Sequence, residues 1–340
     1  MTLIETDQAA ADTNVAADDV LVVEDLRVYY DTRQGVLKAV DGVSFTLQQG
    51  QRLALVGESG SGKSTLATAL MGMTTPPGRI YGGKVSLSGR DLLAMTRSEM
   101  RMARLSEIAL VPQGAMNSLN PVTRVERQIV DGIIDHTEGD KPTKQELKDR
   151  VEELLRSVGL PASVARMYPH ELSGGMKQRV VMAIGTALSP KLIVADEPTS
   201  ALDVVVQRQI METLGKLQEG LNASVILIGH DMGLIAQFAD LVGIMYAGKL
   251  VEIGPVNEIF ENPQHPYTQL LIQSLPSFNK TTEFNGIPGL PPTLMNLPAG
   301  CSFSPRCPFV MDKCNVDEPV TREVKPGQQA SCHLFEGDQD

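Results

Sequence analysis

The sequence predicts an α/β fold whose core is a sheet of buried strands. Four apolar runs of strand length recur along the chain, at residues 53–56, 108–111, 192–195 and 225–228, and such short runs are typical of covered strands. Residues 123–188 are mainly helical in pattern. The run 53–56 leads through a glycine-rich loop into a helix-like segment, which completes a strand–loop–helix unit.

The chain before this unit is expected to form a leader and then strands. Residues 1–19 are acidic and rich in alanine, so we expect a flexible leader. Residues 20–30 and 43–47 have the pattern of strands, and the alternation in the second indicates an antiparallel sheet with one solvated face. Tyr30 has two open roles, which are packing in the core and stacking of its ring on a nucleotide base.

The glycine-rich loop is the most specific motif in the chain. Residues 57–64 satisfy the phosphate-loop pattern G-x-x-x-x-G-K-[ST]. The N–H groups of such a loop surround an anion at the positive end of a helix. We expect Lys63 to reach the β- and γ-phosphates of a nucleotide and the Ser64 hydroxyl to bind Mg²⁺. The candidate nucleotide-binding residues in this segment are Gly57, Ser59, Gly60, Ser61, Gly62, Lys63, Ser64 and Thr65.

Two later segments place polar groups at the end of a strand or at the start of a helix. Gln113 follows the run 108–111, where ligands bind in open sheets, although an ordinary loop glutamine fits the sequence equally well. Ser173, Gly174 and Gly175 open a helix-like segment and form a second candidate anion site. The alternative for these three residues is a glycine-rich helix cap.

Acidic residues follow the apolar run 192–195. Asp196 is placed to hold Mg²⁺, directly or through water. Glu197 is placed to activate or orient an attacking water. The run 225–228 similarly leads to His230, although a lone histidine is more often structural.

The composition restricts the class of protein. The net charge of −11 argues against a general nucleic-acid binder. No apolar stretch is long enough to span a membrane, and residues 1–19 lack the cationic start and apolar segment of a secretory signal. We therefore expect a cytoplasmic protein that does not bind nucleic acid.

The C-terminal part differs in character from the rest. Residues 241–254 have the pattern of a β-hairpin and residues 267–275 that of a helix. Prolines are dense after residue 254, where no further strands are expected, and residues 286–300 resemble a linker. All four cysteines fall after residue 300, at Cys301, Cys307, Cys314 and Cys332.

Taken in chain order, the motifs resemble those of ABC-transporter ATPases over residues 20–275. The matching features are the phosphate loop, the Q-loop glutamine Gln113, the signature at 172–176, Walker B with Asp196 and Glu197, the D-loop at 200–203, the switch histidine His230 and the adenine-stacking aromatic Tyr30. Met176 departs from the commonest signature, which has glutamine there. The implied fold is an ABC-type P-loop NTPase with a RecA-like core, an antiparallel β subdomain, a helical subdomain at about 115–188 and a cysteine-containing extension at 276–340.

The same resemblance implies ATP hydrolysis coupled to transport. The implied catalytic residues are Glu197, His230 and Gln113, and the implied Mg²⁺ ligands are Ser64, Gln113 and Asp196. Ser173, Gly174 and Gly175 would cap the γ-phosphate of ATP held by a partner ATPase.

The implied assembly places the chain on the cytoplasmic face of the cell membrane. Its partners would be two transmembrane permease subunits, a second homologous ATPase and, indirectly, an extracellular substrate-binding protein. The loop that follows Gln113, from Asn117 to Pro121, would contact the permeases.

A narrower resemblance covers the C-terminus. The segments 265–268 and 301–308 look like those of ATPase subunits of oligopeptide and dipeptide importers, a subfamily with relatives assigned to nickel and oligosaccharides. It implies import of a small solute, above all oligopeptides or dipeptides, with oligosaccharide or nickel as alternatives. A non-transport ABC ATPase and an ATP-binding regulator without turnover are two other classes. No long coiled-coil insertion or tandem cassette supports the first, and intact Glu197 and His230 speak against the second.

The cysteines have the spacing C-x₅-C-x₆-C-x₁₇-C, without the close pairs of zinc sites. Disulfides are disfavoured in a reducing cytoplasm. Cys307-Pro308 is similar to ferredoxin-type ligation, and some relatives of this subfamily carry a [4Fe–4S] cluster. We expect Cys301, Cys307, Cys314 and Cys332 to ligate such a cluster, with Zn²⁺ or free buried cysteines as alternatives. Because this tail lies beyond every nucleotide motif, the cluster is expected to be structural and not catalytic.

Overall fold

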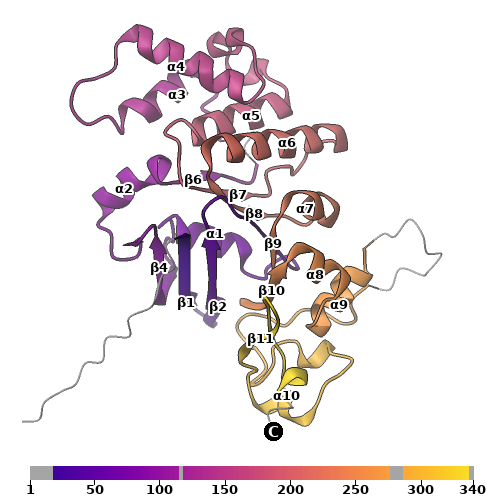
Figure 1. Cartoon of the computed structure of the whole chain (residues 1–340). Coiled ribbons are helices and arrows are strands. Elements are labelled where there is room, and N and C mark those ends of the chain that lie inside the picture. The colour runs from indigo at the N-terminus through magenta and orange to yellow at the C-terminus, as the bar shows by residue number, and fades with distance from the viewer. Residues whose placement is uncertain (1–17, 115–117, 276–285, 337–340) are drawn as a thin grey trace, which may run out of the picture.

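The protein was analysed as a computed structural model, which describes residues 18–114, 118–275 and 286–336 (Figure 1). In these residues the main sheet has eight strands, in the order β11-β12-β10-β9-β3-β8-β7-β6, and a second sheet has the order β2-β1-β4-β5. Figure 1 shows α3, α4 and α5 at one end of the molecule and the C-terminal segment at the other, beside β10. Residues 1–17 of the expected leader lie outside the described residues. The same holds for Asn117, the first residue of the loop expected to contact the permeases.

Twelve strands lie within the described residues. They are β1 (Asp19–Thr32), β2 (Gly35–Gln48), β3 (Arg52–Val56), β4 (Gly78–Leu87), β5 (Arg90–Asp91), β6 (Ile108–Val111), β7 (Leu192–Asp196), β8 (Ser224–Ile228), β9 (Leu241–Tyr246), β10 (Lys249–Pro255), β11 (Thr321–Lys325) and β12 (Gln328–Ser331).

All the α-helices of the described residues follow β3 in the chain. The α-helices are α1 (Lys63–Leu70), α2 (Arg97–Ser106), α3 (Val125–Ile134), α4 (Lys144–Ser157), α5 (Gly174–Gly185), α6 (Val204–Leu221), α7 (Met232–Phe238), α8 (Val256–Glu261), α9 (Pro266–Gln273) and α10 (Asp312–Val316). Short 3₁₀ turns are η2 (Ala162–Arg166), η3 (Pro169–Glu171), η4 (Ser304–Arg306) and η5 (His333–Phe335).

The four apolar runs of the sequence form the parallel centre of the main sheet, as predicted. β3 pairs with β8, β8 with β7 and β7 with β6, all in parallel. Alternate side chains of these strands enter two separate hydrophobic cores. The core shared with α3 to α9 contains Ala54, Ile193 and Val225, whereas the core shared with β1, β2 and α1 contains Leu53, Val194 and Ile226. The sheet is therefore covered on both faces, which explains its uniformly apolar strands.

The N-terminal segments form the antiparallel sheet that the alternation predicts. β1 pairs antiparallel with both β2 and β4. The pairing is interrupted near Asp25, which has a positive φ of 46°. Both strands are longer than the sequence indicates, and β2 continues down to Gly35, which brings Leu37 and Ala39 beside the phosphate loop.

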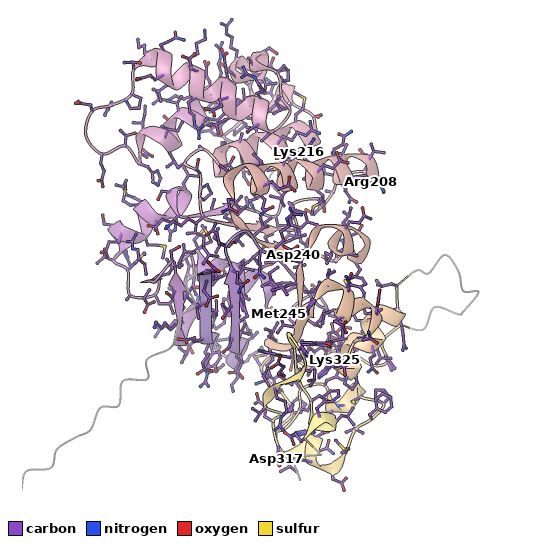
Figure 2. The ribbon with its side chains drawn as sticks, in the orientation of Figure 1. Arg208, Lys216, Asp240, Met245, Asp317 and Lys325 are labelled. Atoms are coloured by element: carbon purple, nitrogen blue, oxygen red, sulfur yellow. The ribbon has the colours of Figure 1, made fainter. Side chains whose placement is uncertain are left out.

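The C-terminal segment corrects one expectation, because strands do not stop at residue 254. β12 pairs antiparallel with β10, matching Ala330 to Glu252, and β11 pairs with β12. The two added strands are short, polar and partly exposed, so no apolar run marks them. Their turn contains Gly327 with φ 73°, which follows Pro326 and gives the only local signal of a hairpin. Figure 2 labels Met245 of β9, Lys325 of β11 and, at the lower end of the C-terminal segment, Asp317, which follows α10.

A buried carboxyl group fastens this segment to the sheet. Glu252 of β10 is 1% exposed. It accepts hydrogen bonds from the backbone N–H groups of Gln264 (2.8 Å) and His265 (2.9 Å) and from Nε2 of Gln328 (2.8 Å). Buried polar groups require such partners. Glu252 thus joins β10, the start of α9 and β12.

Candidate active site

A pocket of about 430 Å³ lies where parallel strands of the main sheet end, which is the place where open α/β sheets bind ligands. The phosphate loop follows β3, Gln113 follows β6, Glu197 follows β7 and His230 follows β8. The lining residues are Tyr30, Leu37, Ala39, Gly57, Ser59, Gly60, Gly62, Lys63, Ser64, Thr65, Gln113, Glu197, His230 and Leu294.

Two glycines of the phosphate loop are required by close backbone approach. Gly57 has φ 153° and Gly62 has φ 105°. An added Cβ would lie 2.0 Å from the carbonyl oxygen of Met245 at Gly57, and 2.1 Å from that of Ala39 at Gly62. No side chain fits at these distances, so the loop must be glycine-rich to lie between β2 and β9.

The Lys63 ammonium lies inside this loop. Its Nζ donates to the carbonyl oxygens of Gly57 (2.8 Å) and Glu58 (2.9 Å) and to Oγ of Ser61 (3.2 Å). Burial lowers the pKa of Lys63, an effect that Glu197 and Asp196 oppose. Ser61 is buried and does not line the pocket, so among the described contacts its side chain serves the loop itself.

Ser64 and Asp196 lie together beside the pocket. The Ser64 hydroxyl donates to Oδ1 of Asp196 at 3.2 Å. Burial raises the pKa of Asp196, while the bond from Ser64 acts in the opposite direction. A hydroxyl and a carboxylate oxygen are the hard ligands that Mg²⁺ takes together with phosphate oxygens, so this pair has the donor chemistry for the ion that accompanies ATP.

Glu197 is turned toward the pocket by its backbone. It has φ 44°, in the left-handed region that non-glycine residues rarely adopt. Nε2 of Gln113 donates to Oε2 of Glu197 at 2.6 Å, and Nδ1 of His230 lies 4.0 Å from Oε1. The His230 side chain is 74% exposed. Gln113 and His230 therefore both lie at the carboxylate of Glu197, the third residue predicted to be catalytic. The catalytic roles of the three stay predictions.

Tyr30 and Leu294 line the part of the pocket near β1 and β2. The Tyr30 ring packs against Gly78, where an added Cβ would lie 2.8 Å from Cε1. Leu294 comes from the segment predicted to be a linker, and no sequence signal marks it as part of a site. Its carbonyl oxygen accepts the backbone N–H of Lys38 at 3.1 Å.

The second predicted anion site lies elsewhere. Ser173 caps α5, and its Oγ accepts the backbone N–H of Met176 at 3.3 Å. Gly175 allows close packing on α6, because an added Cβ would lie 2.7 Å from Cγ1 of Val206. Among the described residues that line the phosphate-loop pocket, Ser173, Gly174 and Gly175 do not appear. The two predicted anion sites of this chain therefore do not face the same pocket.

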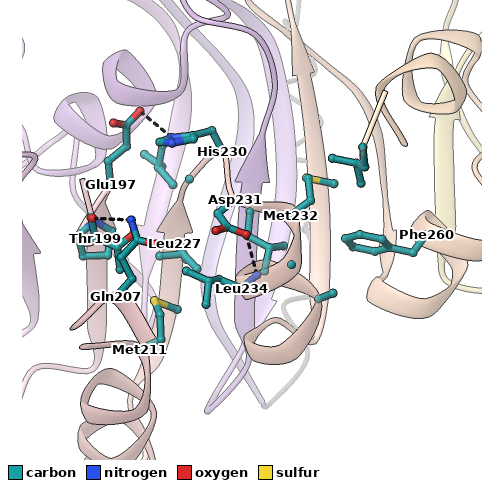
Figure 3. A pocket seen from close by; sticks show the side chains of 17 residues that line it. Glu197, Thr199, Gln207, Met211, Leu227, His230, Asp231, Met232, Leu234 and Phe260 are labelled. Atoms are coloured by element: carbon teal, nitrogen blue, oxygen red, sulfur yellow. Dashed lines mark hydrogen bonds and ion pairs between the residues drawn. The ribbon is translucent and has the colours of Figure 1, made fainter. Parts of the chain in front are cut away.

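A larger cavity of about 600 Å³ adjoins the other side of Glu197 and His230 (Figure 3). Its walls are mostly apolar and include Met211 and Phe260. It contains none of the phosphate-loop residues in the described part of the chain. The smaller pocket is therefore the candidate for a nucleotide.

The four cysteines line one small cavity with Phe303 and His333. All four are free, and burial raises the pKa of Cys301, Cys307 and Cys332, the last to about 11. In the described residues no group of three or more His, Cys, Asp or Glu side chains is arranged to hold a metal ion. The four thiols thus lie around one cavity and have the donor chemistry of a metal site, but the described residues do not show the arrangement that zinc or the expected [4Fe–4S] cluster requires.

No helix within the residues that the structure describes combines the length and apolar character needed to cross a bilayer.

Comparison with known proteins gives the class to which this fold and site belong. Residues 40–200 match the family described as ABC transporter, and residues 251–314 match the oligopeptide/dipeptide transporter C-terminal region. The fold is that of an ABC ATPase. It is similar to the ATP-binding cassette MJ0796 in a dimeric post-hydrolysis state bound to ADP and Pi, with TM-score 0.62, 25% identity and coverage of 69% of this chain and 98% of that one. It is also similar to cbiO1 of Clostridium perfringens, with TM-score 0.61, 26% identity and coverage of 72% and 92%.

The relatives found by sequence indicate a narrower class of ABC ATPase than the solved structures do. The dipeptide transport ATP-binding protein DppD of Escherichia coli is 42% identical, covering 92% of this chain and 96% of its own length. The oligopeptide transport ATP-binding proteins OppD are 42% identical in Salmonella typhimurium, with 98% of both chains covered, and 44% identical in Bacillus subtilis, with 94% and 89% covered. The chain belongs to the family of ATP-binding subunits of oligopeptide and dipeptide ABC transporters, and it is an ABC-type ATPase.

Proposed function

We propose that this chain is the ATP-hydrolysing subunit that powers import of oligopeptides or dipeptides through a membrane ABC transporter. The observation that carries this proposal is the 42% identity to dipeptide and oligopeptide transport ATP-binding proteins, which extends over nearly the whole chain. The match to the oligopeptide/dipeptide C-terminal region supports the same substrate class.

In the proposed mechanism the pocket holds ATP. The loop N–H groups and Lys63 bind the phosphates, which places charge-assisted donors against the β- and γ-phosphate oxygens. Tyr30 stacks on the adenine. Ser64, Gln113 and Asp196 would hold the Mg²⁺ that accompanies ATP, and this ion would supply positive charge to the phosphate oxygens.

Hydrolysis is assigned to Glu197 with the help of its neighbours. Glu197 accepts a proton from, or orients, the water that attacks the γ-phosphorus, and Lys63 stabilises the negative charge that develops on the leaving ADP. Gln113 donates to the Glu197 carboxylate at 2.6 Å, so it orients that carboxylate. His230, 4.0 Å from Glu197, completes the site as a donor to the γ-phosphate.

A second ATPase completes each site. Ser173, Gly174 and Gly175 stand at the N-terminal end of α5, outside the phosphate-loop pocket of their own chain. We assign them to the γ-phosphate of ATP held by a homologous partner subunit. Closure on ATP would then move two permease subunits, which are contacted by the loop after Gln113, with the chain on the cytoplasmic face of the membrane.

This function is tested by purifying the chain with its permeases and binding protein and measuring ATP hydrolysis. Hydrolysis should be weak for the isolated chain and should rise when partners and a di- or oligopeptide are added. Stimulation by oligosaccharide or nickel instead of peptide would change the substrate. Full, peptide-independent activity of the isolated chain would contradict the transporter role.

We also propose that Cys301, Cys307, Cys314 and Cys332 ligate a [4Fe–4S] cluster. The support is that all four line one cavity. Anaerobically purified protein should contain iron and acid-labile sulfide, and Cys307→Ser should lose both. Stoichiometric zinc without iron, or four freely alkylated thiols without metal, would refute the cluster.

A further inference from the structure

The C-terminal segment, residues 286–336, reaches back to the phosphate-loop pocket in two places. Arg306 of η4 contacts the phosphate loop, and Leu294 forms part of the pocket wall. The position of this segment in the sequence, beyond every nucleotide motif, gives no hint of either contact. Both contacts lie at the pocket proposed to bind ATP, so they concern ATP binding and not the choice of transported solute.

Arg306 holds the side chain of Glu58 in a two-pronged ion pair. Its Nη1 lies 2.7 Å from Oε2 and its Nη2 3.0 Å from Oε1 of Glu58. The Arg306 side chain is only 4% exposed. Nε donates to the carbonyl oxygen of Pro288 at 2.8 Å, and Nη1 lies 3.3 Å from the hydroxyl of Tyr246. A bidentate pair of this kind fixes direction as well as distance.

Glu58 is a residue of the phosphate loop and is in contact with its lysine. The Glu58 carbonyl oxygen accepts from Nζ of Lys63 at 2.9 Å and from the backbone N–H of Ser61 at 3.2 Å. The Glu58 backbone N–H donates to the hydroxyl of Tyr267 at 3.0 Å. The route from Arg306 to Lys63 therefore passes through a single residue.

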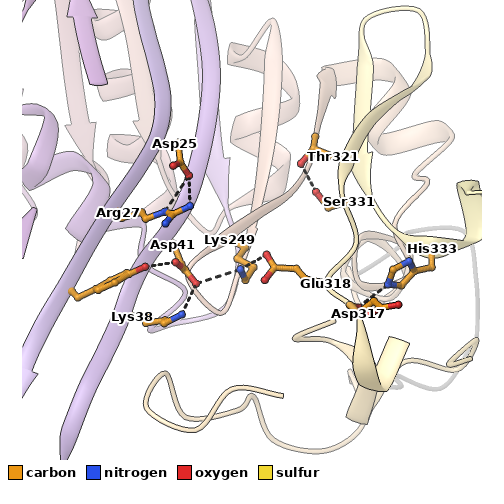
Figure 4. Close-up of polar contacts among 11 residues, drawn as sticks. Asp25, Arg27, Lys38, Asp41, Lys249, Asp317, Glu318, Thr321, Ser331 and His333 are labelled. Atoms are coloured by element: carbon orange, nitrogen blue, oxygen red, sulfur yellow. Dashed lines mark hydrogen bonds and ion pairs between the residues drawn. The ribbon is translucent and has the colours of Figure 1, made fainter. Parts of the chain in front are cut away.

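Further contacts hold this C-terminal segment against the N-terminal sheet. Lys249 bonds both Asp41 of β2, at 3.3 Å, and Glu318 (Figure 4). The carbonyl oxygen of Leu294 accepts the N–H of Lys38 in β2. These bonds keep Leu294 beside Tyr30, Leu37 and Ala39 in the pocket wall.

We propose that the C-terminal segment is a working part of the nucleotide site. Arg306 is a positioning residue that fixes the phosphate loop through Glu58, and Leu294 closes the side of the pocket that takes the base, opposite the phosphates. The proposal rests on the assignment of this pocket to ATP. A loop whose shape is set before the ligand arrives binds more tightly, because less ordering is left for the binding step.

The first test is a double-mutant cycle on nucleotide binding by the full-length chain. Dissociation constants for Mg-ATP and for inorganic tripolyphosphate are measured calorimetrically for wild type, Arg306→Gln, Glu58→Gln and the double variant. Each single change should weaken both ligands by about three- to tenfold, and the double variant should be no weaker than the worse single one. Arg306→Lys should recover part of the affinity, since it keeps the charge and loses the bidentate geometry.

Matched controls separate positioning from general destabilisation. Gln328→Ala loosens the attachment of β12 to β10 without touching Glu58, Tyr246 or Tyr267. Arg322→Gln removes an exposed arginine of the same segment that pairs with Glu336. Both should keep wild-type affinity, even where the melting temperature falls. Wild-type affinity in Arg306→Gln, or an equal loss in Gln328→Ala, would overturn the role of Arg306.

The second test separates the base from the phosphates. Leu294→Ala should weaken Mg-ATP by about two- to fivefold, as expected for partial loss of one apolar contact. Its affinity for tripolyphosphate should stay at the wild-type value. Equal effects on both ligands, or none on ATP, would overturn the role of Leu294. A wild-type chain that binds neither ligand would instead refute the ATP site itself.

Discussion

Gln113 and Glu197 stand 84 residues apart in the chain, yet Nε2 of Gln113 lies 2.6 Å from Oε2 of Glu197. They meet because β6 and β7 are parallel neighbours in the main sheet and both end at the same edge. The contact joins the loop assigned to the permeases with the residue assigned to hydrolysis. Because the two side chains share this hydrogen bond, a movement of one changes the position available to the other.

Glu197→Gln should abolish turnover and preserve nucleotide binding. The amide keeps the size of the side chain but cannot act as a base. General-base catalysis contributes about 10²- to 10⁴-fold to a rate. Phosphate release and Mg-ATP binding are the two measurements. Glu153→Gln, an exposed residue of α4 paired with Arg150, is the matched control and should behave as wild type. Near-normal turnover in Glu197→Gln would remove this residue from the mechanism.

Lys63→Ala should weaken binding before it affects chemistry. The ammonium is the charged donor inside the loop, and loss of a charge-assisted phosphate contact costs about 1.5–3 kcal/mol, or roughly 10- to 150-fold in affinity. Titration with Mg-ATP measures this change. Lys216→Ala on α6, outside the phosphate-loop pocket, serves as control. Unchanged affinity in Lys63→Ala would mean that ATP binds elsewhere.

Glu252→Ala should detach the C-terminal segment from the main sheet. The change removes the acceptor of three N–H donors. The Gln328 amide keeps a second acceptor, the carbonyl oxygen of Asn262 at 3.3 Å, and we expect a loss of about 3 kcal/mol in the free energy of unfolding. Denaturant unfolding measures it. The exposed Glu261→Ala should change stability by less than about 0.5 kcal/mol. A Glu252→Ala protein as stable as that control would contradict the anchoring role.

Stability should fall in mild acid because of His265. Burial lowers the pKa of this histidine from its ordinary value of 6.5 to about 3. The unfolded chain therefore binds a proton that the folded chain excludes, and stability that is fully present above pH 6.5 is lost progressively as the pH falls toward 3. Each pH unit in this window is worth up to about 1.4 kcal/mol. Glu252 and the cysteine cavity adjoin this residue.

His265→Asn isolates that contribution. Asparagine can accept the N–H of Tyr267 as His265 does, but it does not titrate. Unfolding free energies measured from pH 7 to pH 4 should show a shallower slope in this variant. The exposed His170→Asn should leave the slope unchanged, and an unchanged slope in His265→Asn would contradict the assignment.

The sequence predicts the features that depend on local pattern. The parallel strands follow from their apolar runs, because a strand covered on both faces has no polar side to display. The phosphate loop follows from Gly57, Gly62 and Lys63, because the backbone geometry permits few alternatives.

Features with a weak local pattern, or none, cannot be predicted in this way. Helix α6 begins with three valines after Asp203, and β-branched residues weaken a helical signal. Strands β11 and β12 are polar because they extend an edge. The contact of Arg306 with Glu58 spans 248 residues, and no periodicity or motif encodes it.

The most direct test of the central claim is ATP-driven uptake of a labelled dipeptide. Proteoliposomes would carry the permeases and both ATPases, with Mg-ATP enclosed and the binding protein outside. We predict accumulation with wild type and none above background with Glu197→Gln or Lys63→Ala. Equal uptake with Glu197→Gln, or accumulation of oligosaccharide or nickel with no peptide uptake, would contradict the account.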